Sequence, residues 1–180
     1  QATNNWLDLT GTNVMVNVND SGVDATHPDL QGRMFAANSG ELRDANGHGT
    51  HVIGTIAGNG AMSSTVSNAN GAINPGTNGQ FRGGAPGASV FVQHVSFRSR
   101  PGISAGGPTL PDSRLQETAA RTNALISNNS WHYGGNSGYD LASARYDAAT
   151  RDAIPAEMGS QPLLFVFAAG NAGNSKDDGG

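Results

Sequence analysis

The chain contains no cysteine, a single lysine (Lys176) and few charged residues of either sign. The lack of cysteine excludes a disulfide scaffold, thiol catalysis and thiolate metal sites. The scattered arginines form no basic stripe, so we expect no nucleic-acid partner. The longest apolar run, residues 163–169, falls well short of the roughly 18 residues that a membrane span needs, so we expect no membrane partner.

The 180 residues that are present suit one globular domain. Hydrophobic residues make up 36% of the chain, and its 26 glycines show no triplet period, which excludes fibrous proteins. The formal net charge is only −4, lower than is typical of disordered chains. The chain begins at Gln1 without a methionine, which we interpret as a processed start. The composition, poor in charge and rich in Asn, Ser and Gly, favours a secreted or extracytoplasmic protein.

Strand and helix patterns alternate along the chain. Periodicity and turn residues predict strands at residues 13–19, 89–95, 124–127 and 163–169, and helices at residues 50–57, 113–123 and 140–154. Such alternation predicts right-handed βαβ units in an α/β fold, with a mostly parallel sheet and helices on both faces. Two Gly-rich stretches, residues 59–87 and 96–111, are predicted as long surface loops, a length usually associated with function or mobility.

Polar residues follow three of the predicted strands. Asp20, Ser130 and Asn171 each lie at the carboxyl end of a predicted strand, within three residues of its last position. In parallel sheets, ligands bind beyond the carboxyl ends of the strands. The pattern alone therefore places the chemistry at this edge. The first strand also contains Asn17 and Asn19, which would need hydrogen-bond partners if both faces of the sheet are covered.

Three short motifs lie in order on these predicted elements. They are Val-Asn-Asp-Ser-Gly-Val-Asp at residues 18–24, Asp-Ala-Asn-Gly-His-Gly-Thr-His-Val-Ile-Gly at residues 44–54, and Ala-Ala-Gly-Asn-Ala-Gly at residues 168–173. Together they resemble the Asp, His and oxyanion-hole motifs of the subtilisin-like serine proteases. The resemblance implies a subtilisin-like fold, a serine endopeptidase activity, and residues 1–180 as the N-terminal portion of a single peptidase domain.

The resemblance assigns a role to one residue in each motif. Asp20 would orient His48, His48 would act as the general base, and Asn171 would donate a hydrogen bond to the oxyanion. Taken by position alone, each has a simpler explanation. Asp20 could cap a turn, His48 could be satisfied by local backbone at a helix start, and Asn171 could occupy a left-handed turn. The three motifs together favour the catalytic roles.

Substrate-binding residues follow from the same resemblance. Residues 127–134 resemble the segment that lines the primary specificity pocket, where backbone can pair with an extended peptide. The residues assigned to substrate binding are Ser130, Trp131, His132, Gly134, Ala169 and Gly170. The Gly-rich residues 100–107 would supply the opposite edge. Alternatively, the aromatic residues of the first segment belong to an ordinary pocket rim.

The chemistry implied here requires no cofactor. His51 follows His48 by three residues, and such a pair could suggest a metal. The glutamate of the zinc-protease helix is missing and no third ligand is evident, and the resemblance makes the second His a helix residue, so we interpret His51 as structural. Asp29, in the segment His-Pro-Asp-Leu, resembles a carboxylate that binds structural calcium in several family members. The loop at residues 58–87 offers Asn oxygens to such an ion, although Asn/Gly loops commonly form without one.

The family's nucleophile motif, a Gly-Thr-Ser-Met-Ala-like segment, is not found in residues 1–180. The serine would therefore come from a second chain or from a C-terminal segment, as in a nicked or truncated protease acting on peptide or protein substrates. The alternative is a pseudoprotease that binds peptides without cleaving them. A nucleotide-binding domain is less favoured, because no Gly-x-Gly-x-x-Gly links a first strand to a helix.

Overall fold

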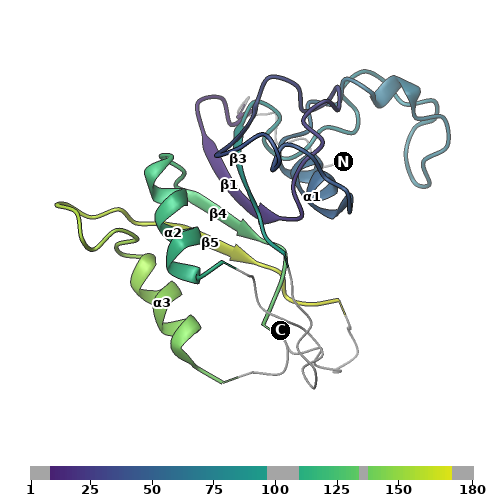
Figure 1. Cartoon of the computed structure of the whole chain (residues 1–180). Helices are drawn as coiled ribbons and strands as arrows, with labels where there is room; N and C mark the ends of the chain where they lie inside the picture. Colours follow the sequence, from purple (N-terminus) through teal and green to yellow (C-terminus); the bar gives the residue numbers. More distant parts are fainter. Residues whose placement is uncertain (1–8, 97–109, 134–137, 172–180) are drawn as a thin grey trace.

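The structure is a computed structural model that describes residues 9–96, 110–133 and 138–171 (Figure 1). Its elements in chain order are β1 (Met15–Asp20), β2 (Met34–Ala36), α1 (His48–Ala57), η2 (Ser63–Thr65), β3 (Ser89–His94), α2 (Asp112–Arg121), β4 (Ile126–Asn129), α3 (Leu141–Ala149) and β5 (Leu164–Phe167). The strands form one parallel sheet in the order β2-β3-β1-β4-β5. The predicted α/β architecture is confirmed.

One face of the sheet carries an apolar core against α1. Val16 and Val18 of β1 lie in register with Ile126 and Asn128 of β4, and with Val90 and Val92 of β3, so these side chains share a face. The valines pack with Ile53 of α1 in a cluster in which most side chains are fully buried. This packing fixes α1 beside the end of β1, where Asp20 lies.

The opposite face carries buried amides beneath α2. Asn19 Nδ2 donates to Asn129 Oδ1 at 2.8 Å, and Asn19 Oδ1 accepts from Gln93 Nε2 at 3.0 Å. Ser127 Oγ donates to Asn17 Oδ1 at 3.0 Å, and Gln93 Nε2 also reaches the Leu115 carbonyl of α2 at 3.0 Å. The predicted need of Asn17 and Asn19 for partners is thus met by a network across three strands. Buried polar groups satisfied in this way specify strand register as well as stability.

Helices α2 and α3 lie on this second face, away from α1 (Figure 1). Ala119 of α2 and Ala149 of α3 pack together against Leu163 and Phe165 at β5. Helices therefore lie on both faces of the sheet, as predicted.

Most observed element bounds differ from the predicted ones by one or two residues, and two of the differences have a clear local cause. Strand β4 begins at Ile126 instead of residue 124, because Asn123 is left-handed (φ 58°) and Ala124 N still bonds to the Ala119 carbonyl of α2. Helix α3 ends at Ala149 instead of residue 154, because Ala153 N bonds to the Gln161 carbonyl and leaves the helical pattern. The short elements β2 and η2 were not predicted.

The two predicted loops differ in what the structure describes. Residues 59–87 are ordered by local bonds, such as the two between Asn74 and the backbone of Ala69. In the other loop, residues 97–109 lie outside the described part, including the predicted substrate edge at residues 100–107.

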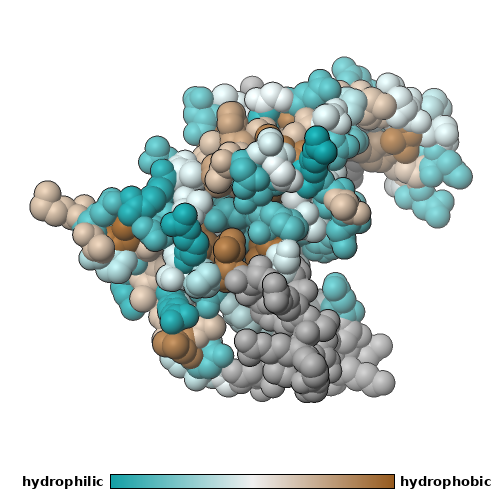
Figure 2. All heavy atoms as spheres, viewed as in Figure 1, coloured by the Kyte–Doolittle hydropathy of each residue, from teal (hydrophilic) through white to brown (hydrophobic). Residues whose placement is uncertain are grey.

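The outer strand β5 exposes apolar side chains on the same face as α1. Leu164 is 61% exposed and Val166 is 46% exposed, and their register with Ile126 and Asn128 places them on that face. In the view of Figure 2, apolar surface otherwise occurs in small patches among hydrophilic residues. Among the described residues, none of the helices has the length and apolarity required to cross a bilayer.

Candidate active site

Asp20 and His48 form a hydrogen-bonded pair. His48 Nδ1 lies 2.7 Å from Asp20 Oδ1. The Asp20 side chain is 3% exposed, whereas that of His48 is 53% exposed. A buried carboxylate on Nδ1 selects one imidazole tautomer and leaves Nε2 available to an outside group. This is the arrangement that the sequence predicts for a base and its orienting acid.

Asp20 and His48 lie close together because a strand ends at the first and a helix begins at the second. Asp20 is the last residue of β1, and His48 is the first residue of α1. The next helical residue, Gly49, lets the helix approach the strand end closely. A Cβ at Gly49 would lie 2.2 Å from the Gly22 carbonyl oxygen and 3.2 Å from Asp20 Oδ1. Glycine is therefore required there for the pair to form.

Asp44 is a site residue to which sequence reasoning assigned no role. Its Oδ1 accepts hydrogen bonds from Ser21 Oγ, Asn46 N and Gly47 N at 2.9–3.1 Å. Its Oδ2 accepts from the Thr50 amide at 2.8 Å and from the Thr50 hydroxyl at 2.7 Å. The carboxylate thus caps the start of α1, where the helix dipole also favours a negative charge.

These hydrogen bonds predict an acid-dependent loss of stability. Burial alone would raise the pKa of Asp44, but the bonds from Thr50, Gly47 and Ser21 outweigh it and lower the pKa from 3.8 to about 2. A lowered pKa in the folded state stabilises the fold above pH 3.8, and this contribution is lost as the pH falls towards 2. We expect the free energy of unfolding, measured with urea, to fall as the pH is lowered from 3.8 towards 2. In Asp44→Asn the free energy of unfolding should change less steeply with pH. Equal slopes in the two proteins would contradict the prediction.

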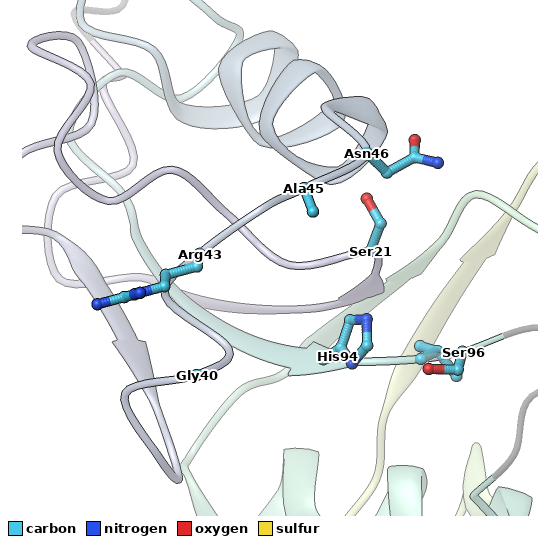
Figure 3. A pocket seen from close by; sticks show the side chains of 8 residues that line it. Ser21, Gly40, Arg43, Ala45, Asn46, His94 and Ser96 are labelled. Atoms are coloured by element: carbon cyan, nitrogen blue, oxygen red, sulfur yellow. The ribbon is translucent and has the colours of Figure 1, made fainter.

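A cleft of about 520 Å³ lies beside Ser21 and Asn46 (Figure 3). It is lined by Ser21, Gly40, Arg43, Ala45, Asn46, His94, Val95 and Ser96. The His94 ring points into it, while the Arg43 side chain points away. The cleft adjoins the chain neighbour of Asp20 and the Asn46-Gly47 turn before His48. Sequence reasoning missed it because its lining comes from three separate segments.

The other predicted residues lie along the same edge of the sheet. Ser130 follows β4, and Ala169, Gly170 and Asn171 follow β5. Ala168 N donates to the Asn129 carbonyl at 3.1 Å, which holds the two chain segments together just past the strands. Asn171 is exposed and lies two strands away from Asp20 in the sheet order. Gly134 lies outside the described residues.

Trp131, Tyr133 and Phe167 form a packed aromatic cluster, called the wall below, and not an open pocket rim. The Trp131 ring is only 6% exposed and belongs to a core cluster with Val95 and Leu115. It meets Tyr133 and Phe167 edge-on, with ring centroids 5.4 and 5.5 Å apart. Trp131 and His132 also line a second cavity, of about 490 Å³, between this segment, α3 and β5.

Asp112 holds this wall from α2. Its buried carboxylate accepts hydrogen bonds from the hydroxyl groups of Tyr133 and Tyr146. Burial raises the pKa of both hydroxyls, and the nearby Asp112 carboxylate raises it further. The two tyrosines therefore stay protonated as donors. Asp112 is the first residue of α2 and anchors the wall to this helix.

Protein donors engage one carboxylate oxygen and the backbone carbonyl of Asp29. Asp29 Oδ1 accepts a hydrogen bond from Met62 N at 2.8 Å, and its carbonyl accepts from Arg33 Nη2 at 2.6 Å and from Asn59 N at 3.0 Å. Across the described ranges, no group of three or more His, Cys, Asp or Glu side chains could hold a metal. Calcium takes six to eight oxygen ligands, and here amide and guanidinium donors surround the residue. These contacts do not test the calcium site expected at Asp29, and metal removal tests it below.

Comparison with known proteins now decides the family. A profile of the subtilase family of peptidases matches residues 11–180. The chain belongs to the subtilase family. This subtilase is 31% identical over 177 residues to serine protease AprX of Bacillus subtilis, covering 94% of the chain and 35% of AprX. It is 32% identical over 168 residues to subtilisin Savinase of Lederbergia lenta, covering 92% of the chain and 50% of that protein.

Solved structures agree on the fold of the subtilase. The fervidolysin structure from Fervidobacterium pennivorans gives a TM-score of 0.53 at 26% identity, over 92% of this chain and 22% of that one. The MycP3 protease of a type VII secretion system gives a TM-score of 0.57 at 23% identity, over 92% of this chain and 43% of that one. The subtilase chain thus spans about a third to a half of the curated relatives named above.

Proposed function

We propose that this subtilase chain provides the base, the orienting acid and one oxyanion donor of a serine endopeptidase. The observation that carries the proposal is the 2.7 Å hydrogen bond between buried Asp20 and half-exposed His48 at the carboxyl edge of the sheet. Such a pair suits proton transfer from a nucleophile placed at Nε2. Family membership supports serine chemistry at this pair.

The proposed mechanism divides the steps among these residues. His48 takes the proton of a serine hydroxyl as that oxygen attacks the scissile carbonyl, while Asp20 stabilises the imidazolium. His48 then returns the proton to the leaving amine. Asn171 donates its side-chain amide to the oxyanion, a contact that typically contributes about 2.7–4 kcal/mol in the transition state. Water then hydrolyses the acyl-enzyme by the same path.

We propose that the serine comes from a segment or a second chain outside residues 1–180, within a single peptidase domain of which these residues form the N-terminal portion. The exposed face of β5 supports this. Leu164 and Val166 lie on the face that carries α1 and His48, and they are 61% and 46% exposed. An apolar helix packed there beside α1 would cover them and bring its end towards His48.

The substrate is proposed to be a peptide or protein segment bound in extended form along the ends of β4 and β5. Ser130, His132 and Gly134 on one side and Ala169 and Gly170 on the other would pair with it through backbone groups. Because the Trp131 ring is buried among core residues, only its backbone can serve this purpose. The cleft at Ser21 and His94 would receive a neighbouring substrate side chain. Secretion remains part of the proposal on composition alone.

A fluorophosphonate probe tests the function directly. The protein that contains this chain is treated with the probe, and the labelled peptide is identified by mass spectrometry. We expect labelling of a serine outside residues 1–180, and its loss in His48→Ala. Binding of an extended peptide that survives His48→Ala, with no labelling in either form, would overturn the protease and favour the peptide-binding pseudoprotease.

The role of Asp29 makes a separate prediction about metal removal. Because Met62 N and Arg33 already engage Asp29, we expect EGTA to change the melting temperature of the chain by less than about 1 °C. Asp29→Ala should lower the melting temperature with or without calcium. A rise of several degrees on adding calcium, absent in Asp29→Ala, would instead establish a calcium site at this residue. Differential scanning calorimetry measures both.

A further inference from the structure

The catalytic carboxylate of Asp20 is held from one side only. Both of its hydrogen bonds arrive at Oδ1, from His48 Nδ1 at 2.7 Å and from Ser21 N at 2.7 Å. Oδ2 is buried and accepts no hydrogen bond from any residue that the structure describes. The orientation of the carboxylate towards His48 therefore depends on the turn at Ser21.

The Ser21 side chain links this turn to the helix of His48. Its hydroxyl donates to Asp44 Oδ1 at 2.9 Å and accepts from Gly49 N at 2.9 Å. The hydroxyl thus joins the end of β1 to the residue directly after His48. Since a hydroxyl has one proton, the Asp44 carboxylate decides where that proton points and leaves the lone pairs for Gly49.

A second bridge runs parallel to the first. Asp44 Oδ2 accepts from the Thr50 hydroxyl at 2.7 Å, and that hydroxyl in turn accepts from Asp24 N at 2.9 Å. Both bridges connect the segment after β1, residues 21–24, to the first turn of α1. Both converge on the two oxygens of one partly buried carboxylate, that of Asp44.

We propose that Asp44 is a positioning residue of the Asp20–His48 pair, acting through Ser21 and Thr50. Its hydrogen bonds hold the start of α1 close to the end of β1, so that His48 Nδ1 and Asp20 Oδ1 stay within hydrogen-bond distance. The word "catalytic" for this pair rests on the proposed function. The claim about geometry does not rest on the proposed function, because the Asp20–His48 hydrogen bond is present in the structure whether or not the protein is an enzyme.

The test measures the Asp20–His48 hydrogen bond itself. In the protein that contains this chain, the Nδ1 proton of His48 is followed by low-temperature proton NMR with selective ¹⁵N-histidine labelling, in the wild type and in Asp44→Asn. We expect the hydrogen-bonded Nδ1 signal to be lost or broadened in Asp44→Asn. In the protease that contains the chain, kcat should fall about 10–100-fold with KM within about twofold, as for a misplaced catalytic group.

Two further variants serve as a control and as a second test in case Asp44→Asn does not fold. Asp24→Asn removes a nearby acid whose carboxylate, among the described residues, accepts hydrogen bonds from Thr26. The substitution keeps the Asp24 backbone amide that bonds to Thr50, so it should keep the Nδ1 signal and kcat. Ser21→Ala breaks the first bridge and leaves the helix cap, so it should weaken the signal even if Asp44→Asn fails to fold. An intact Nδ1 signal in Asp44→Asn, or in Ser21→Ala where Asp44→Asn is unfolded, overturns the proposal. If the wild-type protein shows no peptide hydrolysis, the proposed function fails. The NMR comparison still tests the positioning role of Asp44 in that case.

Discussion

If the proposed protease function holds, replacing His48 with alanine should lower kcat by about 10⁶-fold, the size of loss known for the base of such triads. The reason lies in the geometry of the pair. His48 is the group that Asp20 holds at 2.7 Å, and half of its side chain is open to a reacting partner. KM should change little, because His48 acts mainly in the transition state.

Asp20→Asn should cost less, about 10⁴-fold in kcat. The amide keeps the size of the carboxylate but favours the wrong imidazole tautomer and cannot stabilise the imidazolium. Combining the two substitutions should add almost nothing to His48→Ala, since residues that act as a unit are not additive. Steady-state hydrolysis of a peptide ester or amide measures all three.

His51→Ala is the matched control. His51 lies on the same helix, one turn further along, and is exposed. Its removal should leave kcat within about threefold of the wild type. If His51→Ala lost as much activity as His48→Ala, the assignment of the base would be wrong.

The motifs in the sequence were enough to place the main elements of the site. Asp20 and His48 were predicted at a strand end and a helix start, because their flanking turn residues and periodicity are local signals. The parallel sheet then brings the ends of β1, β4 and β5 to one edge. This is a consequence of topology that a sequence pattern can predict.

The partners of buried polar residues could not be predicted in the same way. Asn19 finds Asn129 across 110 positions of sequence, and Ser21 finds Asp44 across 23. Neither pairing has a periodic signature, because each depends on which strands become neighbours and how closely α1 approaches. Strand β2 was missed for a different reason, since the three residues Met34–Ala36 are too few to show an alternation.

The last prediction concerns the close approach of α1 to β1. Gly49→Ala should destabilise the chain by about 1–3 kcal/mol, because the new methyl group would lie 2.2 Å from the Gly22 carbonyl oxygen and must displace backbone. It would also lie 3.2 Å from Asp20 Oδ1, the atom that binds His48. We therefore expect loss of the Asp20–His48 hydrogen bond together with loss of stability, measured by urea unfolding and by the Nδ1 proton signal.

Gly54→Ala is the control on the same helix. A Cβ at Gly54 would meet nothing within 4 Å, so the substitution should only remove the helix cost of glycine and stabilise the chain by about 0.5–1 kcal/mol. The two glycines differ in contact and not in local backbone, since both lie in α1. Opposite signs for the two substitutions would show that Gly49 serves the approach of the helix to Asp20. If both substitutions stabilised the chain, the start of α1 would not lie as close to the end of β1 as described.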